Sequence, residues 1–146
     1  MSITFKHSFE HIDFDAVSQW LGDAYWSPGI TREEVIIGAR NSSLVVGGFD
    51  ELGKQVSFLR LLSDKVRFAY ILDVIVDPAR RKQGIGTAMV SYAMNHPEMS
   101  LVYQWLLRTR DAHGVYAQLG FGPLANPDQW MIIQNPREDR SQFQGL

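Results

Sequence analysis

The chain has 146 residues, of which 45% are hydrophobic and 12% aromatic, so it can form one domain around a single core. Its formal net charge of −2 gives no sign of a nucleic-acid or membrane-surface binder. The absence of cysteine excludes disulfides, thiolate metal sites and a cysteine nucleophile, and no run of about 18 apolar residues could span a membrane. The charged N-terminus does not read as a signal peptide, so we expect a cytoplasmic protein made of one domain, residues 1–146.

The first third of the chain is predicted to contain a short strand and two helices. Residues 3–7 alternate between apolar and polar side chains, as in a strand. Residues 13–22 begin with an aspartate that can cap a helix and carry apolar residues at helical spacing. A second helix, residues 31–40, follows a Pro-Gly turn. It opens with Thr31 three residues before Glu34, the pattern of a capping box.

Three β-type runs follow in the middle of the chain. Residues 43–49 and 55–62 are apolar and are separated by the turn-forming residues 50–53, which predicts a hairpin. The longer run at residues 67–76 continues this meander. We therefore expect three neighbouring strands that pair antiparallel.

The last part of the chain alternates between helices and strands. Residues 87–97 predict a helix that a proline ends, and residues 101–109 predict a strand. A short helix at residues 110–120 and a last strand at residues 129–134 follow, and the polar residues 136–146 predict a flexible tail. The order β-α-α-β-β-β-α-β-α-β predicts an α/β fold with a mixed, mostly antiparallel central sheet flanked by helices.

The segment between the strand at residues 67–76 and the next helix has the features of an anion site. The turn at residues 77–78 is followed by three basic residues, 80–82, and then by Gly84 and Gly86. A helix N-terminus offers about four unpaired N–H groups and a partial positive charge, and glycines leave access to them. The predicted phosphate-binding residues are Arg81, Lys82, Gln83, Gly84, Ile85, Gly86 and Thr87.

This loop fits neither of two common nucleotide motifs. A Walker loop needs Gly-Lys-Ser/Thr after its spacer, and that sequence is absent. A dinucleotide fingerprint needs its third glycine where Met89 stands. The Arg-x-x-Gly-x-Gly pattern of residues 81–86 instead resembles the acetyl-CoA loop of the GNAT superfamily of N-acetyltransferases, and a Tyr-x-x-x-Gly-Phe pattern at residues 116–121 resembles a second feature of that family. The similarity covers about residues 3–134.

The resemblance implies how acetyl-CoA would be bound and used. Val74, Ile75 and Val76 would pair through their backbone with the pantetheine arm, and the N–H of Ile75 or Val76 could donate to the thioester oxygen. Tyr116 would act as general acid toward the departing thiolate. The alternative for Tyr116 is a tyrosine that only packs the short helix.

Three further residues are candidates on the acceptor side. Asp73 interrupts an apolar run, where the resemblance implies a carboxylate that takes the amine proton or binds a cationic substrate. The alternative is a structural partner for Arg60 or Arg67. Tyr25 and Trp26 could line an acceptor pocket, although aromatic residues at this spacing are also common in cores.

The sequence predicts no metal site, because His113 has no second histidine or cysteine at ligand spacing. We expect an acyltransferase that moves acetyl from acetyl-CoA to a primary amine of a small molecule or peptide by direct attack. The alternative is a non-catalytic CoA-binding sensor or interaction module. Homodimers are common in the family, so the resemblance leaves a homodimer open, with no nucleic acid or membrane as partner.

Overall fold

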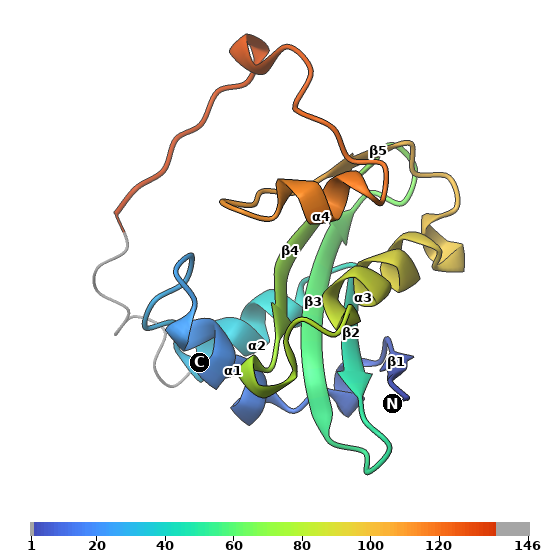
Figure 1. The fold of residues 1–146 in the computed structure, drawn as a ribbon. Coiled ribbons are helices and arrows are strands. Elements are labelled where there is room, and N and C mark those ends of the chain that lie inside the picture. The colour runs from blue at the N-terminus through green and yellow to red at the C-terminus, as the bar shows by residue number, and fades with distance from the viewer. Residues whose placement is uncertain (1, 137–146) are drawn as a thin grey trace.

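One mixed sheet organises the part of the chain that the computed structural model describes, residues 2–136. Its strands are β1 (Thr4–Lys6), β2 (Leu44–Phe49), β3 (Gln55–Ser63), β4 (Phe68–Val76) and β5 (Gln104–Leu106). They lie in sequence order, antiparallel from β1 to β4, while β5 runs parallel to β4 (Figure 1). The predicted mixed, mostly antiparallel α/β sheet is therefore confirmed.

Helices cover both faces of this sheet. They are α1 (Phe14–Asp23), α2 (Arg32–Arg40), α3 (Ile85–Met94) and α4 (His113–Ala117). Helices α1 and α2 pack against one face, where they meet Val45, Phe58 and Ile75 of the strands. Helices α3 and α4 lie on the opposite face (Figure 1).

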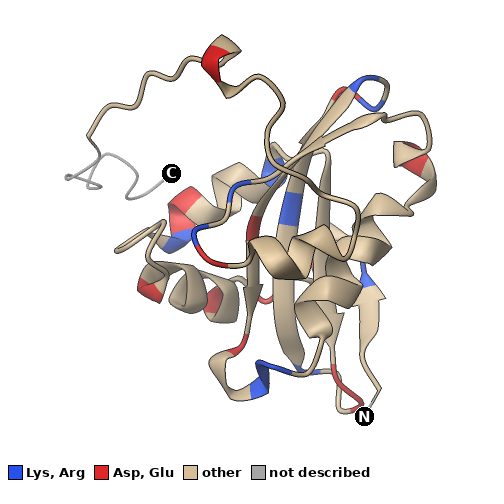
Figure 2. Ribbon diagram, turned by 45° about the horizontal axis from the view of Figure 1, so that its top comes forward, with Lys and Arg blue, Asp and Glu red and all other residues tan. Residues whose placement is uncertain are grey.

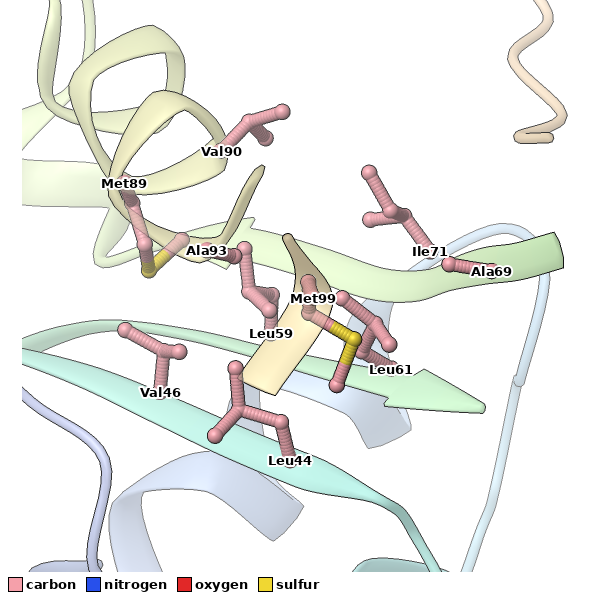
Figure 3. Packing of buried hydrophobic residues seen from close by; sticks show 10 residues of the cluster. All are labelled: Leu44, Val46, Leu59, Leu61, Ala69, Ile71, Met89, Val90, Ala93 and Met99. Atoms are coloured by element: carbon pink, nitrogen blue, oxygen red, sulfur yellow. The ribbon is translucent and has the colours of Figure 1, made fainter. Parts of the chain in front are cut away.

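The larger of the two cores lies under α3. Figure 3 shows Met89, Val90 and Ala93 of the helix above apolar side chains of β2, β3 and β4. The sheet and the chain after the helix complete the cluster with Leu44, Val46, Leu59, Leu61, Ala69, Ile71 and Met99. Burial of this apolar surface is the main force that fixes α3 on the sheet.

The predicted starts of the early helices are confirmed by their caps. The Asp13 side chain accepts a hydrogen bond from the N–H of Ala16 at 3.2 Å, and Thr31 Oγ1 accepts one from the N–H of Glu34 at 3.2 Å. The predicted helix at residues 87–97 begins earlier, at Ile85, because Gly84 adopts a left-handed backbone with φ of 78° and caps it.

Strand β4 has a bulge opposite β3. Phe58 pairs with Ile75 and Arg60 pairs with Leu72, so two residues of β4 face one residue of β3. Within the bulge, Asp73 has a φ of 56°, the left-handed region that aspartate tolerates better than most residues. The bulge turns the Asp73 side chain and re-aims the end of β4.

Strand β5 diverges from β4 soon after the two strands meet. The pairing covers Phe68 to Tyr70 of β4 and Gln104 to Leu106 of β5, so β5 is shorter than the predicted residues 101–109. From Ile71 to Val76 the edge of β4 that faces β5 has no strand partner in the described chain. This divergence opens the sheet at the end of β4.

The C-terminal predictions differ most from the structure. The helix predicted at residues 110–120 is shortened to α4, and the strand predicted at residues 129–134 is not formed. A short 3₁₀ turn, Pro127–Gln129, stands there instead, and the residues after it have no regular secondary structure up to residue 136. A strand needs a neighbour, and this segment reaches none in the described chain. The predicted tail starts at residue 136, and residues 137–146 lie outside the described residues.

Candidate active site

A cavity of about 790 Å³ lies at the end of β4, where Arg110 and Asp111 of the chain after β5 also line it. The end of β4 forms one wall, and the segment between α1 and α2 forms another. Of the predicted site residues, the cavity lining includes Tyr25, Trp26, Val74, Ile75, Val76 and Arg81. The structure thus brings the predicted pantetheine strand and the predicted acceptor residues to one place.

The loop from β4 to α3 turns sharply at the edge of this cavity. Asp77 Oδ1 accepts a hydrogen bond from the N–H of Ala79 at 3.0 Å, and a 3₁₀ turn follows at Pro78–Arg80. Arg81 Nε then donates to the carbonyl oxygen of Val76 at 3.1 Å, which holds the loop against the strand end. The basic residues of this loop appear in blue after the end of β4 in Figure 2.

The start of α3 leaves its backbone donors available. In the described chain, no N–H of residues 82–87 donates to a backbone acceptor, and the first helical bond runs from Ala88 N to Gly84 O at 3.1 Å. A Cβ on Gly84 would meet no atom within 4 Å, so the space in front of these amides is open. The side of Gly86 faces Val76, since a Cβ there would lie 3.6 Å from Val76 Cγ2. This arrangement suits a bound anion.

Tyr116 lies on α4, half-buried against the core under that helix. Its ring meets the Phe121 ring edge-on, with 6.0 Å between centroids. Burial raises the pKa of the Tyr116 phenol above its ordinary value of 10.0, and Tyr25 adds to the rise. The hydroxyl forms no hydrogen bond within residues 2–136. Its predicted packing against the short helix is therefore observed, and the hydroxyl is still available to a ligand.

Asp73 is held by two partners. Its Oδ2 accepts from Arg60 Nε at 2.7 Å, and its Oδ1 accepts from Trp26 Nε1 at 3.0 Å. The Arg60 and Asp73 side chains are only 23% and 14% exposed, so this ion pair is largely shielded from water. The predicted structural pairing with Arg60 is confirmed, and through Asp73 it fixes the indole of Trp26 beside the cavity.

The acceptor side of the cavity is bridged by Tyr25 and Arg110. The Arg110 guanidinium lies over the Tyr25 ring at 3.8 Å from its centroid. The backbone N–H of Arg110 donates to the Tyr25 hydroxyl at 3.1 Å. Trp26 meets Tyr25 edge-on at 5.1 Å. These contacts join the segment after α1 to the segment before α4. Sequence reasoning did not connect Arg110 with Tyr25, because the contact spans 85 positions.

The described residues contain neither a candidate metal site nor a helix that could span a membrane. Within residues 2–136, no three His, Asp or Glu side chains gather closely enough to hold a metal ion. In the same part of the chain, none of the helices has the length and apolar character needed to cross a bilayer.

The sheet opens at the end of β4 beside a helix N-terminus, and this is the arrangement expected from the resemblance to an acetyltransferase. A family model described as an acetyltransferase (GNAT) domain matches residues 40–123. The chain belongs to the GNAT family of acetyltransferases, as the loop and downstream motifs predict. A comparison with curated proteins found no match.

Solved structures of other GNAT proteins agree with this assignment. A putative acetyltransferase of the GNAT family from Xanthomonas campestris pv. campestris shares 33% identity, with 93% of this chain and 95% of that chain covered and a TM-score of 0.85. A GNAT family acetyltransferase from Streptococcus pneumoniae TIGR4 shares 26% identity over 94% of this chain and 100% of its own, with a TM-score of 0.71. Glucosamine-6-phosphate N-acetyltransferase from Arabidopsis thaliana, at 17% identity, covers 95% and 100% of the two chains with a TM-score of 0.68 and shares the fold.

Proposed function

We propose that this acetyltransferase, acting as one domain, moves the acetyl group of acetyl-CoA directly to a primary amine of a small molecule or peptide. The observation that carries the proposal is the edge of β4 at Val74 to Val76, which pairs with no strand of the described chain. It ends beside residues 82–87, whose N–H groups donate to no backbone acceptor in the same part of the chain. An extended pantetheine arm can pair with such an edge as a strand does, while helix N-terminal amides hold a phosphate. The coenzyme supplies the activated thioester.

The residues present fit two parts of the coenzyme, its pyrophosphate and its thioester. Arg81, Lys82, Gln83, Gly84, Ile85, Gly86 and Thr87 form the proposed pyrophosphate site. The side chain of Arg81 is committed to the Val76 carbonyl, so the loop is ordered before any ligand arrives. The N–H of Ile75 or Val76 is the proposed donor to the thioester oxygen, where charge develops during attack.

Tyr116 is the proposed general acid for the departing thiolate. A general acid must carry its proton at the working pH, and the raised pKa of this buried phenol keeps it protonated throughout the neutral range. Tyr25, which lines the acceptor side of the cavity, adds to this rise in the pKa of Tyr116. No covalent intermediate on the protein is needed, because the amine attacks the thioester carbon directly.

The pH dependence of the reaction follows from the substrate ammonium and the Tyr116 phenol. We expect kcat/KM to rise between about pH 6 and pH 9, because an alkyl ammonium with a pKa near 10 must lose its proton before attack. The donor form of Tyr116 is lost only above its raised pKa, so no alkaline fall from this group should occur below about pH 10. Initial rates of thiol release at constant ionic strength measure the profile. A fall below pH 9 that the Tyr116→Phe variant lacks would contradict the raised pKa of Tyr116.

The role of Asp73 as the base that takes the amine proton stays a prediction. Both of its carboxylate oxygens already accept hydrogen bonds, from Arg60 and Trp26. This favours a positioning role, in which Asp73 orients Trp26 and the amine proton leaves through water. Tyr25 and Trp26 are the proposed contacts of the acceptor. The Tyr25 ring already holds the Arg110 guanidinium, so Trp26 is the ring that can attract an amine that arrives as a cation.

One variant separates the two roles of Asp73. We expect Asp73→Asn to lower the free energy of unfolding by about 1.5–3 kcal/mol, because Arg60 loses a charged and mostly buried partner. If Asp73 only positions Trp26, the pH profile of kcat/KM keeps its shape and its height falls. Denaturant unfolding and the pH profile measure the two effects. A profile that changes its shape in Asp73→Asn would instead keep Asp73 as a candidate base.

The proposed reaction is tested with a panel of amines, including amino acids, polyamines, amino sugars and peptides. We expect at least one amine to stimulate release of the CoA thiol and to gain the mass of one acetyl group. Binding of acetyl-CoA in calorimetry without thiol release for any amine would favour the sensor. No heat of binding at millimolar acetyl-CoA would remove the coenzyme site itself.

A further inference from the structure

The cavity at the end of β4 is lined by charges of both signs. Its lining includes the aspartates Asp23, Asp77 and Asp111 and the arginines Arg81 and Arg110. Carboxylates suit an acceptor that arrives as an ammonium ion, because opposite charges attract. Arg110 has no part in the proposed transfer to the amine. Its guanidinium is instead suited to a second, anionic group on the acceptor.

The two arginines of the lining differ in how their side chains are engaged. Arg81 Nε donates to the carbonyl oxygen of Val76 at 3.1 Å, so this side chain holds the loop. Within residues 2–136, the Arg110 guanidinium has one charged partner, Asp111, at 3.8 Å. That distance is too long for a hydrogen bond, and ion pairs between exposed side chains contribute little to stability. The N–H groups of the Arg110 guanidinium are therefore available to a ligand.

Tyr25 fixes Arg110 in place before any acceptor binds. The guanidinium lies 3.8 Å from the centroid of the Tyr25 ring, and the backbone N–H of Arg110 donates to the Tyr25 hydroxyl at 3.1 Å. A guanidinium is planar and carries five N–H donors, so one that contacts a ring with its face keeps donors at its edge. Those donors match the two oxygens of a carboxylate. Because the side chain is already held, it has less conformational entropy to lose when a ligand binds.

Arg110 lies within reach of the reacting end of the cavity for a short acceptor. The Tyr25 and Trp26 rings meet edge-on with 5.1 Å between centroids. The Trp26 indole is hydrogen-bonded to Asp73, which precedes Val74 of the proposed pantetheine-binding edge. Two ring contacts therefore separate the guanidinium from the end of the cavity where the amine is proposed to attack. An extended residue spans about 3.3–3.6 Å, so an amino acid or a dipeptide is long enough to occupy both places.

We propose that Arg110 binds a carboxylate of the acceptor, so that the amine substrate is a short zwitterion, an amino acid or a dipeptide with a free carboxyl group. This inference rests on the proposed function and names its substrate class. A carboxylate fits better than a phosphate, because the aspartates of the lining outnumber its arginines and repel a dianion more strongly than a single negative charge. The same aspartates attract the ammonium end of the zwitterion.

Dipeptides and their C-terminal amides test the proposal as matched pairs, because the two forms differ in the carboxylate and their amines are nearly equally basic. We expect the free acid to exceed the amide in kcat/KM by about 10- to 100-fold, the range for a hydrogen bond to a charged group. This preference should disappear in Arg110→Gln. Arg110→Lys should keep part of it, because the charge remains without the planar fork. Arg108→Gln removes an exposed arginine outside the cavity lining and should keep the wild-type preference.

The same ratio separates ligand binding from a structural role of Arg110. If Arg110 only joins the two loops through Tyr25, Arg110→Gln slows both forms of the dipeptide equally and the preference stays as in the wild type. That result would overturn the proposal, as would equal rates for acid and amide in the wild type. A wild-type preference for phosphoethanolamine over β-alanine would also overturn it, since the group recognised would then be a phosphate.

A binding measurement needs no turnover and therefore distinguishes this inference from the proposed function. We would titrate N-acetylated dipeptides and their amides into the CoA-saturated protein and measure the heat of binding. We expect the free acid to bind about 10- to 100-fold more tightly than the amide in the wild type, and no such difference in Arg110→Gln. If this holds while no amine is acetylated, the proposed function fails and the carboxylate site stands. If amines are acetylated but acid and amide bind equally, or neither gives heat at millimolar concentration, the carboxylate site is wrong.

Discussion

We expect that replacing Tyr116 with phenylalanine lowers kcat by about 10²–10⁴-fold and leaves the affinity for acetyl-CoA nearly unchanged. The range is that of general acid catalysis by a positioned side chain. The substitution removes the hydroxyl and keeps the ring, so the edge-on contact with Phe121 survives and α4 stays in place. The CoA thiolate then has to leave without a proton from the protein. Single-turnover rates of thiol release measure the chemical step apart from product release.

A second tyrosine provides the matched control for this experiment. Tyr92 on α3 donates or accepts a hydrogen bond at 2.8 Å with His7 Nδ1, on the side of the core away from the cavity lining. Tyr92→Phe removes the same atom from the same residue type, and we expect its single-turnover rate to equal that of the wild type. If both variants lose the same fraction of the single-turnover rate, the effect at Tyr116 comes from a stability defect. It would then not come from a lost proton transfer.

The parts of the fold that the sequence predicts well depend on neighbouring residues. The cap of α2 is set by Thr31 and Glu34, three positions apart, and the structure contains that contact. The β3–β4 meander follows from two long apolar runs joined by a polar turn. Local signals of this kind are visible without knowledge of the three-dimensional structure.

The site could be predicted only in part, because its acceptor side is built from distant contacts. The run at residues 67–76 reads as a straight strand, whereas pairing with β3 places a bulge at Asp73 and turns that carboxylate toward Arg60 and Trp26. The contact between Tyr25 and Arg110 joins two loops that no spacing rule connects. Tertiary packing decides both features, so a single sequence gives no signal for them.

The incorrect prediction of a last strand has a different cause. Residues 129–134 have the composition of a strand, and that reading of the side chains is reasonable. Composition indicates that a segment can form a strand. The segment also needs the edge of a sheet close enough to pair with. Pro123 and the turn at Pro127–Gln129 lead the segment away from its own sheet. The prediction therefore failed at the level of topology.

The second large effect is expected at the N-terminus of α3, where Gly86→Asp should weaken acetyl-CoA binding by more than about 100-fold. The new carboxylate would lie among the amides proposed to hold the pyrophosphate. Two like charges about 4 Å apart repel by about 4 kcal/mol at an effective dielectric constant of 20, and each 1.4 kcal/mol is a factor of ten in affinity. Calorimetry with acetyl-CoA measures the loss directly.

The same variant should leave the fold intact, which separates the loss of binding from a loss of structure. A Cβ at position 86 would lie 3.6 Å from Val76 Cγ2, an ordinary contact, and an acidic residue in the first turn of a helix is favourable by about 0.3–1 kcal/mol. We therefore expect the midpoint of thermal unfolding without ligand to stay the same or to rise. Gly86→Ala adds a side chain without charge, and we expect it to keep its affinity within about tenfold of the wild type. If Gly86→Ala and Gly86→Asp weaken binding equally, the cause is steric blockage and not charge repulsion. The coenzyme phosphates would then not lie at these amides.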